Sequence, residues 1–231
     1  MNNITPVYHT APWQRTPCML VLDSSGSMSE TVAGKTSTRI EELNRGLQML
    51  KKELCDDETA SMRVQLAVIS VGGPSHSAEL SMDWTDAKDF QPPTLEAEGP
   101  TPLARGMRLA LHHVDRQKRE LNAHGIAYTR PWVMVISDGE PSDGRDTWNA
   151  IVEECRAAEA ARRYVIFPIA VEDGNLRVLQ ALSSTRVARL SSTRFKEYFV
   201  WLSSSLVCVS RSRPGDSVAL PAIDPWGYVP N

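Results

Sequence analysis

The stretch MLVLDSSGSMSE, which spans residues 19–30, decides the fold class of this chain. Its apolar half belongs to a continuous run over residues 18–22, and such a run is typical of a strand that is covered on both faces. Asp23, Ser25 and Ser27 then follow at alternate positions directly after the run. A loop this rich in oxygen can carry a nucleophile, hold a phosphate or bind a metal ion. The rest of the chain has to discriminate among these three kinds of site.

Buried strands alternate with amphipathic helices along nearly the whole chain. Apolar runs predict three more buried strands, over residues 62–70, 132–137 and 164–171, and an alternating pattern predicts a short edge strand over 78–84. Pro168 indicates an edge or a bulge in the last of the buried strands. This order predicts an α/β fold with a mainly parallel sheet, helices on both faces and one short antiparallel edge strand. The other expected elements are helices over residues 39–54, from Pro102 to at least Arg119, 147–162, 175–182 and 194–210, and a short strand over 187–190.

The length and composition predict one domain with two peripheral segments. The chain has 231 residues, of which 42% are hydrophobic, and this suffices for one sizeable core. We expect an N-terminal arm over residues 1–16, the folded domain over 17–210 and an irregular, proline-rich tail over 211–231. The formal net charge of −3 gives no bulk attraction to nucleic acid or to an anionic membrane.

The sequence predicts a soluble, cytoplasmic protein. No stretch approaches the roughly 18 apolar residues that cross a membrane, and residues 1–17 lack the pattern of a signal peptide. The four cysteines, Cys18, Cys55, Cys155 and Cys208, form no C-x-x-C pair. This spacing favours free thiols in a reducing compartment over disulfides.

Nucleotide and nucleophile sites are poorly supported by the sequence. Gly34-Lys35-Thr36 ends like a phosphate-binding loop, but Ser29 stands where that motif needs its first glycine. No G-x-S-x-G pattern surrounds the serines, which argues against a hydrolase triad. An aspartyl-phosphate enzyme built on Asp23 would need a second aspartate as proton donor at the position that Ser25 occupies.

A metal site is the hypothesis that the spacing favours. Alternate residues of the D-x-S-x-S loop converge, and the loops that follow other strands supply Thr101 and Asp138. In a parallel sheet these loops meet at the carboxyl ends of the strands, where ligands bind. Hydroxyl and carboxylate oxygens suit Mg²⁺ best here, with Mn²⁺ or Ca²⁺ as alternatives. The competing interpretation is that the serines cap the next helix and that Asp138 caps a turn.

These five positions resemble the metal-ion-dependent adhesion site (MIDAS) of von Willebrand factor A (vWA) domains. The likeness covers about residues 17–210, and it implies a single Rossmann-like domain with the site at the carboxyl ends of the strands. TPCMLVLDSSGSMSE and WVMVISDGEPSD are similar to the bacterial tellurium-resistance TerY-type branch. The resemblance implies that Ser25, Ser27 and Thr101 bind the metal directly. It also implies that Asp23 and Asp138 act through water.

The expected function is therefore a non-enzymatic protein-interaction module. A cation held by hydroxyls and water-separated carboxylates stays under-neutralised, so it favours a Glu or Asp carboxylate supplied by a partner protein. The resemblance implies kinase-type or phosphatase-type partners in stress-response or phage-defence systems. The alternatives are a metal-dependent phosphohydrolase, a nucleotide-binding regulator, and an accessory subunit of an AAA+ ATPase.

A second candidate surface lies on the helix after Pro102. Five basic side chains recur there at spacings of three and four, opposite the apolar stripe. Such a face is commonly just solvated. The sharper hypothesis is that it docks an acidic partner, whereas the acidic total of the chain disfavours nucleic acid. The residues of this basic face are Arg105, Arg108, His112, Arg116 and Arg119.

Overall fold

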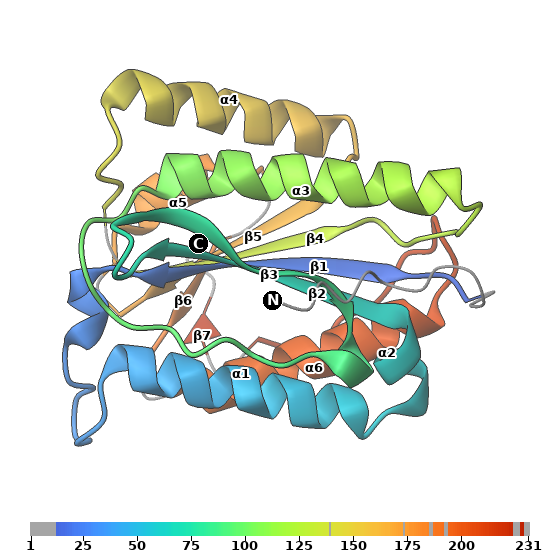
Figure 1. Cartoon of the computed structure of the whole chain (residues 1–231), viewed down its shortest axis with the longest axis horizontal. Helices are drawn as coiled ribbons and strands as arrows, with labels where there is room; N and C mark the ends of the chain where they lie inside the picture. The colour runs from blue at the N-terminus through green and yellow to red at the C-terminus, as the bar shows by residue number, and fades with distance from the viewer. Residues whose placement is uncertain are drawn as a thin grey trace.

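A seven-stranded sheet forms the centre of the molecule, with helices packed on both of its faces (Figure 1). The computed structural model describes residues 13–138, 140–172, 174–184, 187–191, 194–223 and 227–228. The strand order is β3-β2-β1-β4-β5-β6-β7. The strands are β1 (Thr16–Ser24), β2 (Val64–Gly72), β3 (Ser77–Asp86), β4 (Trp132–Ser137), β5 (Val165–Val171), β6 (Ala188–Leu190) and β7 (Gly227–Tyr228).

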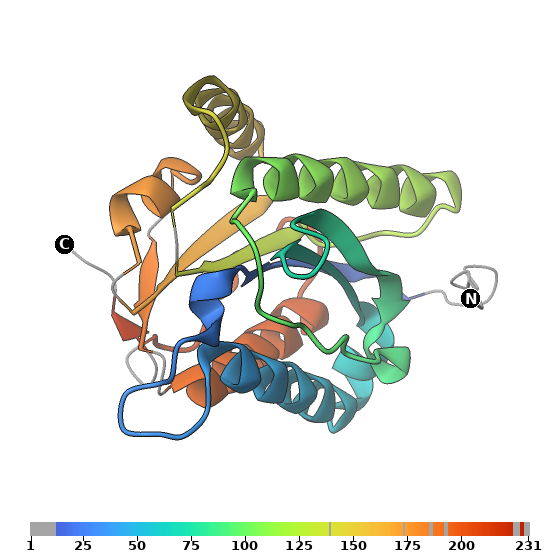
Figure 2. The same cartoon turned by 60° about the vertical axis from the view of Figure 1, so that its left-hand side comes forward.

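The helices divide between the two faces of the sheet (Figures 1 and 2). One face carries α3 (Leu103–Ala123), α4 (Arg145–Ala160) and the short α5 (Leu176–Ala181). The other carries α1 (Arg39–Cys55), α2 (Glu58–Arg63) and α6 (Phe195–Arg211). Two short 3₁₀ helices, η2 (Gly26–Ser29) and η3 (Ala87–Asp89), complete the set.

The continuous apolar run over residues 18–22 lies in the central strand β1, between two hydrophobic clusters. All nine of its residues are buried, and its side chains alternate between two hydrophobic clusters. Leu20 and Leu22 pack with α1 and α6, whereas Met19 and Val21 pack with α3. The apolar residues 18–22 face a hydrophobic cluster on each side of the sheet, so the expected buried strand is confirmed, and the buried polar residues Asp23 and Ser24 stand at its carboxyl end.

The sheet is mostly parallel, and the expected antiparallel edge strand is β3. β1 pairs in parallel with β2 and with β4, β4 pairs in parallel with β5, and β3 runs antiparallel to β2. The two-residue strand β7 adds a second antiparallel pairing, with β6 at the other edge. Nothing in the sequence pattern predicts it, because two residues are too short to show alternation.

Two local expectations change in the structure. Met62 and Arg63 close the unpredicted helix α2, whose N-cap is Asp57, so that β2 begins at Val64. β5 is an interior strand rather than an edge strand, but its pairing with β6 starts only at Ile169. Within the described residues, Pro168 therefore pairs with β4 alone. The proline tolerates this place because no ladder on its other side needs its missing N–H.

The segment after α6 packs onto the body of the domain. Val218, Leu220 and Ile223 contact the cluster beneath α1 and α6, and the indole of Trp201 donates to the carbonyl of Pro221 at 2.9 Å. Among the described helices, none is both long and apolar enough to span a bilayer.

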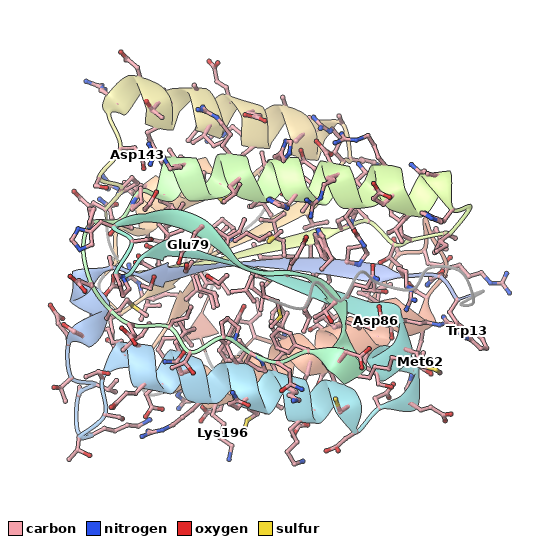
Figure 3. The ribbon with its side chains drawn as sticks, in the orientation of Figure 1. Trp13, Met62, Glu79, Asp86, Asp143 and Lys196 are labelled. Atoms are coloured by element: carbon pink, nitrogen blue, oxygen red, sulfur yellow. The ribbon has the colours of Figure 1, made fainter. Side chains whose placement is uncertain are left out.

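The end of the sheet opposite the candidate site is closed by the chain around Trp13. Figure 3 shows Trp13, Met62 and Asp86 together at that end, far from Asp143. Arg15 joins them through an ion pair with Asp86 at 3.3 Å and a hydrogen bond to the Met62 carbonyl. Residues 1–12 of the expected arm lie outside the described part of the chain.

Candidate metal centre

Asp23 anchors the site between two parallel strands. Leu22 of β1 pairs with Ile136 of β4, so Asp23 and Ser137 follow side by side. One carboxylate oxygen of Asp23 accepts the backbone N–H of Ser25 at 2.9 Å, and the other accepts the Ser137 hydroxyl. The side chain is thereby fixed, although it is fully buried.

The electrostatic surroundings of Asp23 work against its charge. Burial raises its pKa to about 6, and the nearby negative charge of Asp138 acts in the same direction, while hydrogen bonds from Ser137 and Ser25 oppose the rise. A buried carboxylate in this position is stabilised by any cation placed close to it.

The two serines of the motif point toward the third loop. Ser25 Oγ lies 3.1 Å from Ser27 Oγ, and Ser27 Oγ donates to Asp138 Oδ1 at 2.7 Å. Ser25 occupies the N-cap of η2, but its side chain makes no capping hydrogen bond. The capping interpretation is therefore wrong for Ser25. A connected row of oxygens runs instead from the end of β1 to the end of β4.

Ser24 has a different role from its neighbours. Its hydroxyl donates to the carbonyl of Val71 at 3.2 Å, inside the sheet. Its own carbonyl accepts the backbone N–H groups of Gly73 and Glu98 at 2.8 and 3.0 Å. Ser24 thus fastens the loop to β2 and to the segment that precedes Thr101.

The loop that carries Thr101 lies directly against the serine loop. The N–H of Gly26 donates to the carbonyl of Gly99 at 2.9 Å, and Thr101 is buried. A Cβ on Gly72, whose φ is +99°, would lie 2.8 Å from the Pro100 carbonyl oxygen and 2.9 Å from the Ser25 Cα. Glycine is required there because three backbones meet, and this close approach holds the loop that carries Thr101 against the serine loop.

Asp138 is held by a residue that sequence reasoning missed. Arg39, the first residue of α1, donates through Nη1 to Asp138 Oδ2 at 2.6 Å. Its Nη2 contacts Glu30 Oε2 at 2.9 Å. Because Arg39 and Asp138 are 99 positions apart, no local pattern connects them. Asp138 therefore accepts from Ser27 and Arg39 rather than capping a turn.

The loop after β4 is also tied to the start of α3. The N–H of Ser142 donates to the Thr101 carbonyl at 2.9 Å. Asp143 accepts the backbone N–H groups of Ala104 and Arg105 at 2.8 and 3.3 Å, which replaces the cap that Pro102 at the N-cap does not supply. Figure 3 shows Asp143 between the starts of α3 and α4. Sequence reasoning missed this contact as well.

The donor set of the site combines three hydroxyl groups with two carboxylates. In the described ranges, no group of three or more His, Cys, Asp or Glu side chains is arranged to hold a metal ion. A cation at this position would have to use Ser25, Ser27 and Thr101 together with the two aspartates. Such a set consists only of hard oxygen donors.

The residues of the expected basic face do not share one environment. Arg105, Arg108 and His112 line a cleft of about 760 Å³ between α3 and the start of α4. The Nη2 group of Arg116 donates to both carboxylate oxygens of Asp83, at 2.6 and 2.7 Å. Arg119 is exposed, about one turn beyond Arg116 and two turns beyond His112.

Lys35 of the Gly34-Lys35-Thr36 segment forms an ion pair with α1. Lys35 Nζ lies 3.0 Å from Glu42 Oε2 on α1, and the Ser37 hydroxyl donates to the other oxygen of Glu42 at 2.5 Å. The lysine is thus directed toward the helix surface, which gives no support to a phosphate-binding loop.

Comparison with models of known protein families identifies the family of this fold. The model of the von Willebrand factor type A domain matches residues 18–140, which contain β1 and the loops bearing all five candidate ligands. The chain belongs to the von Willebrand factor type A family. No curated protein matches the chain.

Solved structures of other proteins share the fold at low identity. The pilus adhesin SpaC from Lactobacillus rhamnosus GG aligns with a TM-score of 0.62 and 13% identity over 84% of this chain and 31% of its own. The vWF domain of the type V pili tip protein Mfa5 from Porphyromonas gingivalis aligns with a TM-score of 0.61 and 11% identity over 87% of this chain and 98% of its own.

A third similar structure comes from an animal. Proximal thread matrix protein 1 of the mussel byssus aligns with a TM-score of 0.53 and 14% identity over 85% of this chain. The chain spans 31% of the SpaC chain and 49% of the byssus protein. At these identities the likeness supports the fold and nothing finer.

Proposed function

We propose that this vWA domain is a non-enzymatic interaction module that binds Mg²⁺ through Ser25, Ser27 and Thr101. Asp23 and Asp138 contribute through water, and a carboxylate of a partner protein completes the metal shell. The observation that carries the proposal is the row of oxygens from Ser25 through Ser27 to Asp138.

The spacing of these oxygens supports a small hard cation. In an octahedral Mg²⁺ shell with Mg–O distances of about 2.1 Å, neighbouring oxygens lie about 3.0 Å apart. The Ser25–Ser27 separation of 3.1 Å is close to that value, whereas the 2.7 Å between Ser27 and Asp138 is a direct hydrogen bond, which suits an aspartate outside the inner shell. Little rearrangement is then needed for the two serine hydroxyls to bind one metal ion.

The charges around the site support an incoming carboxylate. Asp23 and Asp138 are the acidic groups of the donor set, and Arg39 already neutralises part of the charge on Asp138. A divalent cation held here keeps positive charge to spare. A Glu or Asp side chain from a partner is the hard anionic oxygen ligand that such a cation attracts.

The contacts of the serines favour binding over catalysis. The hydroxyls of Ser25 and Ser27 contact each other and the aspartates, which are weak bases. Activation of a serine nucleophile requires a stronger base, such as histidine, within hydrogen-bond reach. Neither the phosphohydrolase nor the nucleotide-binding alternative gains support from these contacts.

The wider setting in the proposal is a TerY-type protein of a bacterial stress-response or tellurium-resistance system. Its support is the sequence resemblance of the loops alone. The four free cysteines, two of them buried, are consistent with a reducing compartment such as the cytoplasm. A kinase or a phosphatase is the partner class that this setting implies.

Calorimetric titration with Mg²⁺ and with Mn²⁺ tests the metal site. We expect saturable binding by the unaltered protein and none by Asp23→Ala, after circular dichroism has shown that the variant is folded. Equal affinity of the two proteins would exclude the site. Capture of partners from the native host, in Mg²⁺ and in EDTA, tests the adhesive role separately.

A further inference from the structure

We infer that the cleft between α3 and α4 docks an acidic segment of the same partner whose carboxylate reaches the metal. The α3–α4 cleft is lined by Arg105, Arg108 and His112 from α3 and by Ser142, Asp143 and Thr147 from the facing wall. The inference rests on the proposed function in one respect, which is that the segment also supplies the metal-binding carboxylate.

The cleft begins where the candidate metal centre ends. Pro102 lines the cleft and follows Thr101 directly, and Ser142 on the opposite wall donates its N–H to the Thr101 carbonyl. Both walls are thus bonded to the loop that carries a candidate metal ligand. A chain that places one carboxylate at the metal has this cleft as its adjoining surface.

The charge in the cleft favours acidic side chains. In the described part of the chain, Arg108 and His112 make no ion pair, and the guanidinium of Arg105 contacts only the neutral hydroxyl of Ser77, at 3.1 Å. Asp143 is the acidic residue of the lining, and its oxygens already accept two backbone N–H groups. Two arginines are therefore left to attract carboxylates.

The N-terminus of α4 adds to this potential. Helix α4 has sixteen residues, and its N-cap, Gly144, offers no side chain to the first N–H groups. The partial positive charge of these groups lies on the cleft wall, beside Thr147. Asp146 in the first turn is not among the residues that line the cleft.

The length of the cleft defines the length of the segment. Pro102 and His112 are ten helical positions apart, which corresponds to about 15 Å along α3. An extended peptide covers that distance with about four or five residues. The partner should therefore carry acidic residues within about five positions of its metal-binding carboxylate.

The test uses two fluorescein-labelled synthetic peptides and one matched pair of variants. The first peptide has a central glutamate flanked on each side by acidic residues, and the second has glutamine at every flanking position. Arg108→Glu changes the cleft, whereas Arg119→Glu makes the same change in charge at an exposed position of the same helix, about 17 Å further along its axis.

Fluorescence anisotropy at low salt measures the affinity of the protein for each peptide. We expect the acid-flanked peptide to bind the unaltered protein about tenfold more tightly than the glutamine-flanked peptide. Arg108→Glu removes that difference, and Arg119→Glu keeps it. Equal affinity for the two peptides overturns the inference, and so does an equal loss in the two variants, because the effect would then be one of net charge.

Addition of EDTA separates the two proposals. If EDTA abolishes binding of both peptides while Arg108→Glu has no selective effect, the metal proposal stands and the cleft inference fails. If EDTA leaves the affinity for both peptides unchanged while the Arg108→Glu effect persists, the cleft inference stands and the metal-dependent capture fails. A thymidine oligonucleotide that displaces the acidic peptide with the same dependence on Arg108 would assign the cleft to nucleic acid and overturn the inference.

Discussion

The guanidinium of Arg39 lies 2.6 Å from Asp138 Oδ2 and joins the first residue of α1 to the loop after β4. The Asp138 side chain is 1% exposed, so the contact neutralises a buried carboxylate at the edge of the candidate metal centre. Arg39 also contacts Glu30, and it thereby fixes the segment between η2 and α1. The same aspartate therefore faces one resident cation and one proposed cation.

Arg39→Gln should lower stability and increase the response to metal. The loss of the buried pair costs about 2–4 kcal/mol in the free energy of unfolding, because Asp138 stays buried without its counter-charge. Added Mg²⁺ should then recover more stability than in the unaltered protein. Urea denaturation with Mg²⁺ and with EDTA measures both effects. Arg45→Gln, an exposed change on the same helix, is the control, and equal behaviour of the two variants would contradict the prediction.

Adjacent serines should differ in their effect on metal affinity. Ser25→Ala removes an oxygen of the proposed shell and should weaken Mg²⁺ binding at least about tenfold. Ser24→Ala removes a hydroxyl that donates into the sheet to Val71, so it should leave the affinity unchanged. Calorimetry on both variants makes the comparison. A loss of affinity in Ser24→Ala alone would place the site elsewhere.

Asp143→Ala should destabilise the start of α3. The carboxylate accepts two N–H groups that the N-cap Pro102 leaves without a side-chain partner, and its loss costs about 1–2 kcal/mol. Asp143→Asn keeps one acceptor oxygen and should retain part of the stability. Urea denaturation of the two variants distinguishes them, and identical midpoints would show that the cap contributes nothing.

Gly46→Ala should be destabilising although alanine favours helices. A Cβ at this position of α1 would lie 2.1 Å from the Phe199 ring on α6. The clash should outweigh the roughly 1 kcal/mol gain in helix propensity and give a net cost of about 1–3 kcal/mol. Thermal unfolding measures this cost. The double variant Gly46→Ala with Phe199→Leu should lose less than the sum of the single changes, and strict additivity would argue against direct contact.

His113 should make stability depend on pH in the acidic range. Burial lowers the pKa of His113, with a further contribution from the charge of Arg116, so the folded state binds its proton less readily than the unfolded chain. The contribution is complete above the unfolded pKa of about 6.5 and is lost as the pH falls through the lower folded pKa. His113→Gln should therefore flatten the decline of unfolding free energy below about pH 6.5. Arg119→Gln, an exposed change further along the same helix, should keep the slope when urea denaturation is followed across this pH range.

The fold was predictable where burial imposes a simple pattern. The strand around Leu20 is buried on both faces, so its apolar run is continuous, and α1 has one buried stripe, so its apolar residues recur every three or four positions. The helix α2 and the strand β7 were missed because six and two residues are too few to establish a period. Of the two antiparallel edge strands, β3 could be recognised because its ten residues are long enough to show an alternating pattern.

By itself, the sequence determined the vWA architecture and the residue types at the end of each strand. The positions of Asp23, Ser25 and Ser27 follow from a local motif, and Asp138 follows from the rule that parallel strands present their carboxyl ends at one edge. That rule does not place Thr101, because β3 runs antiparallel and ends at Asp86 at the opposite end of the sheet, and the chain returns to the serine loop only at Gly99. Only the tertiary structure revealed that Arg39 neutralises Asp138, that Asp143 caps α3, and that Arg108 lines a cleft whereas Arg116 is paired with Asp83. The physical reason is that a hydrogen bond or ion pair depends on distance in space, and packing brings together side chains that no periodicity of the chain connects.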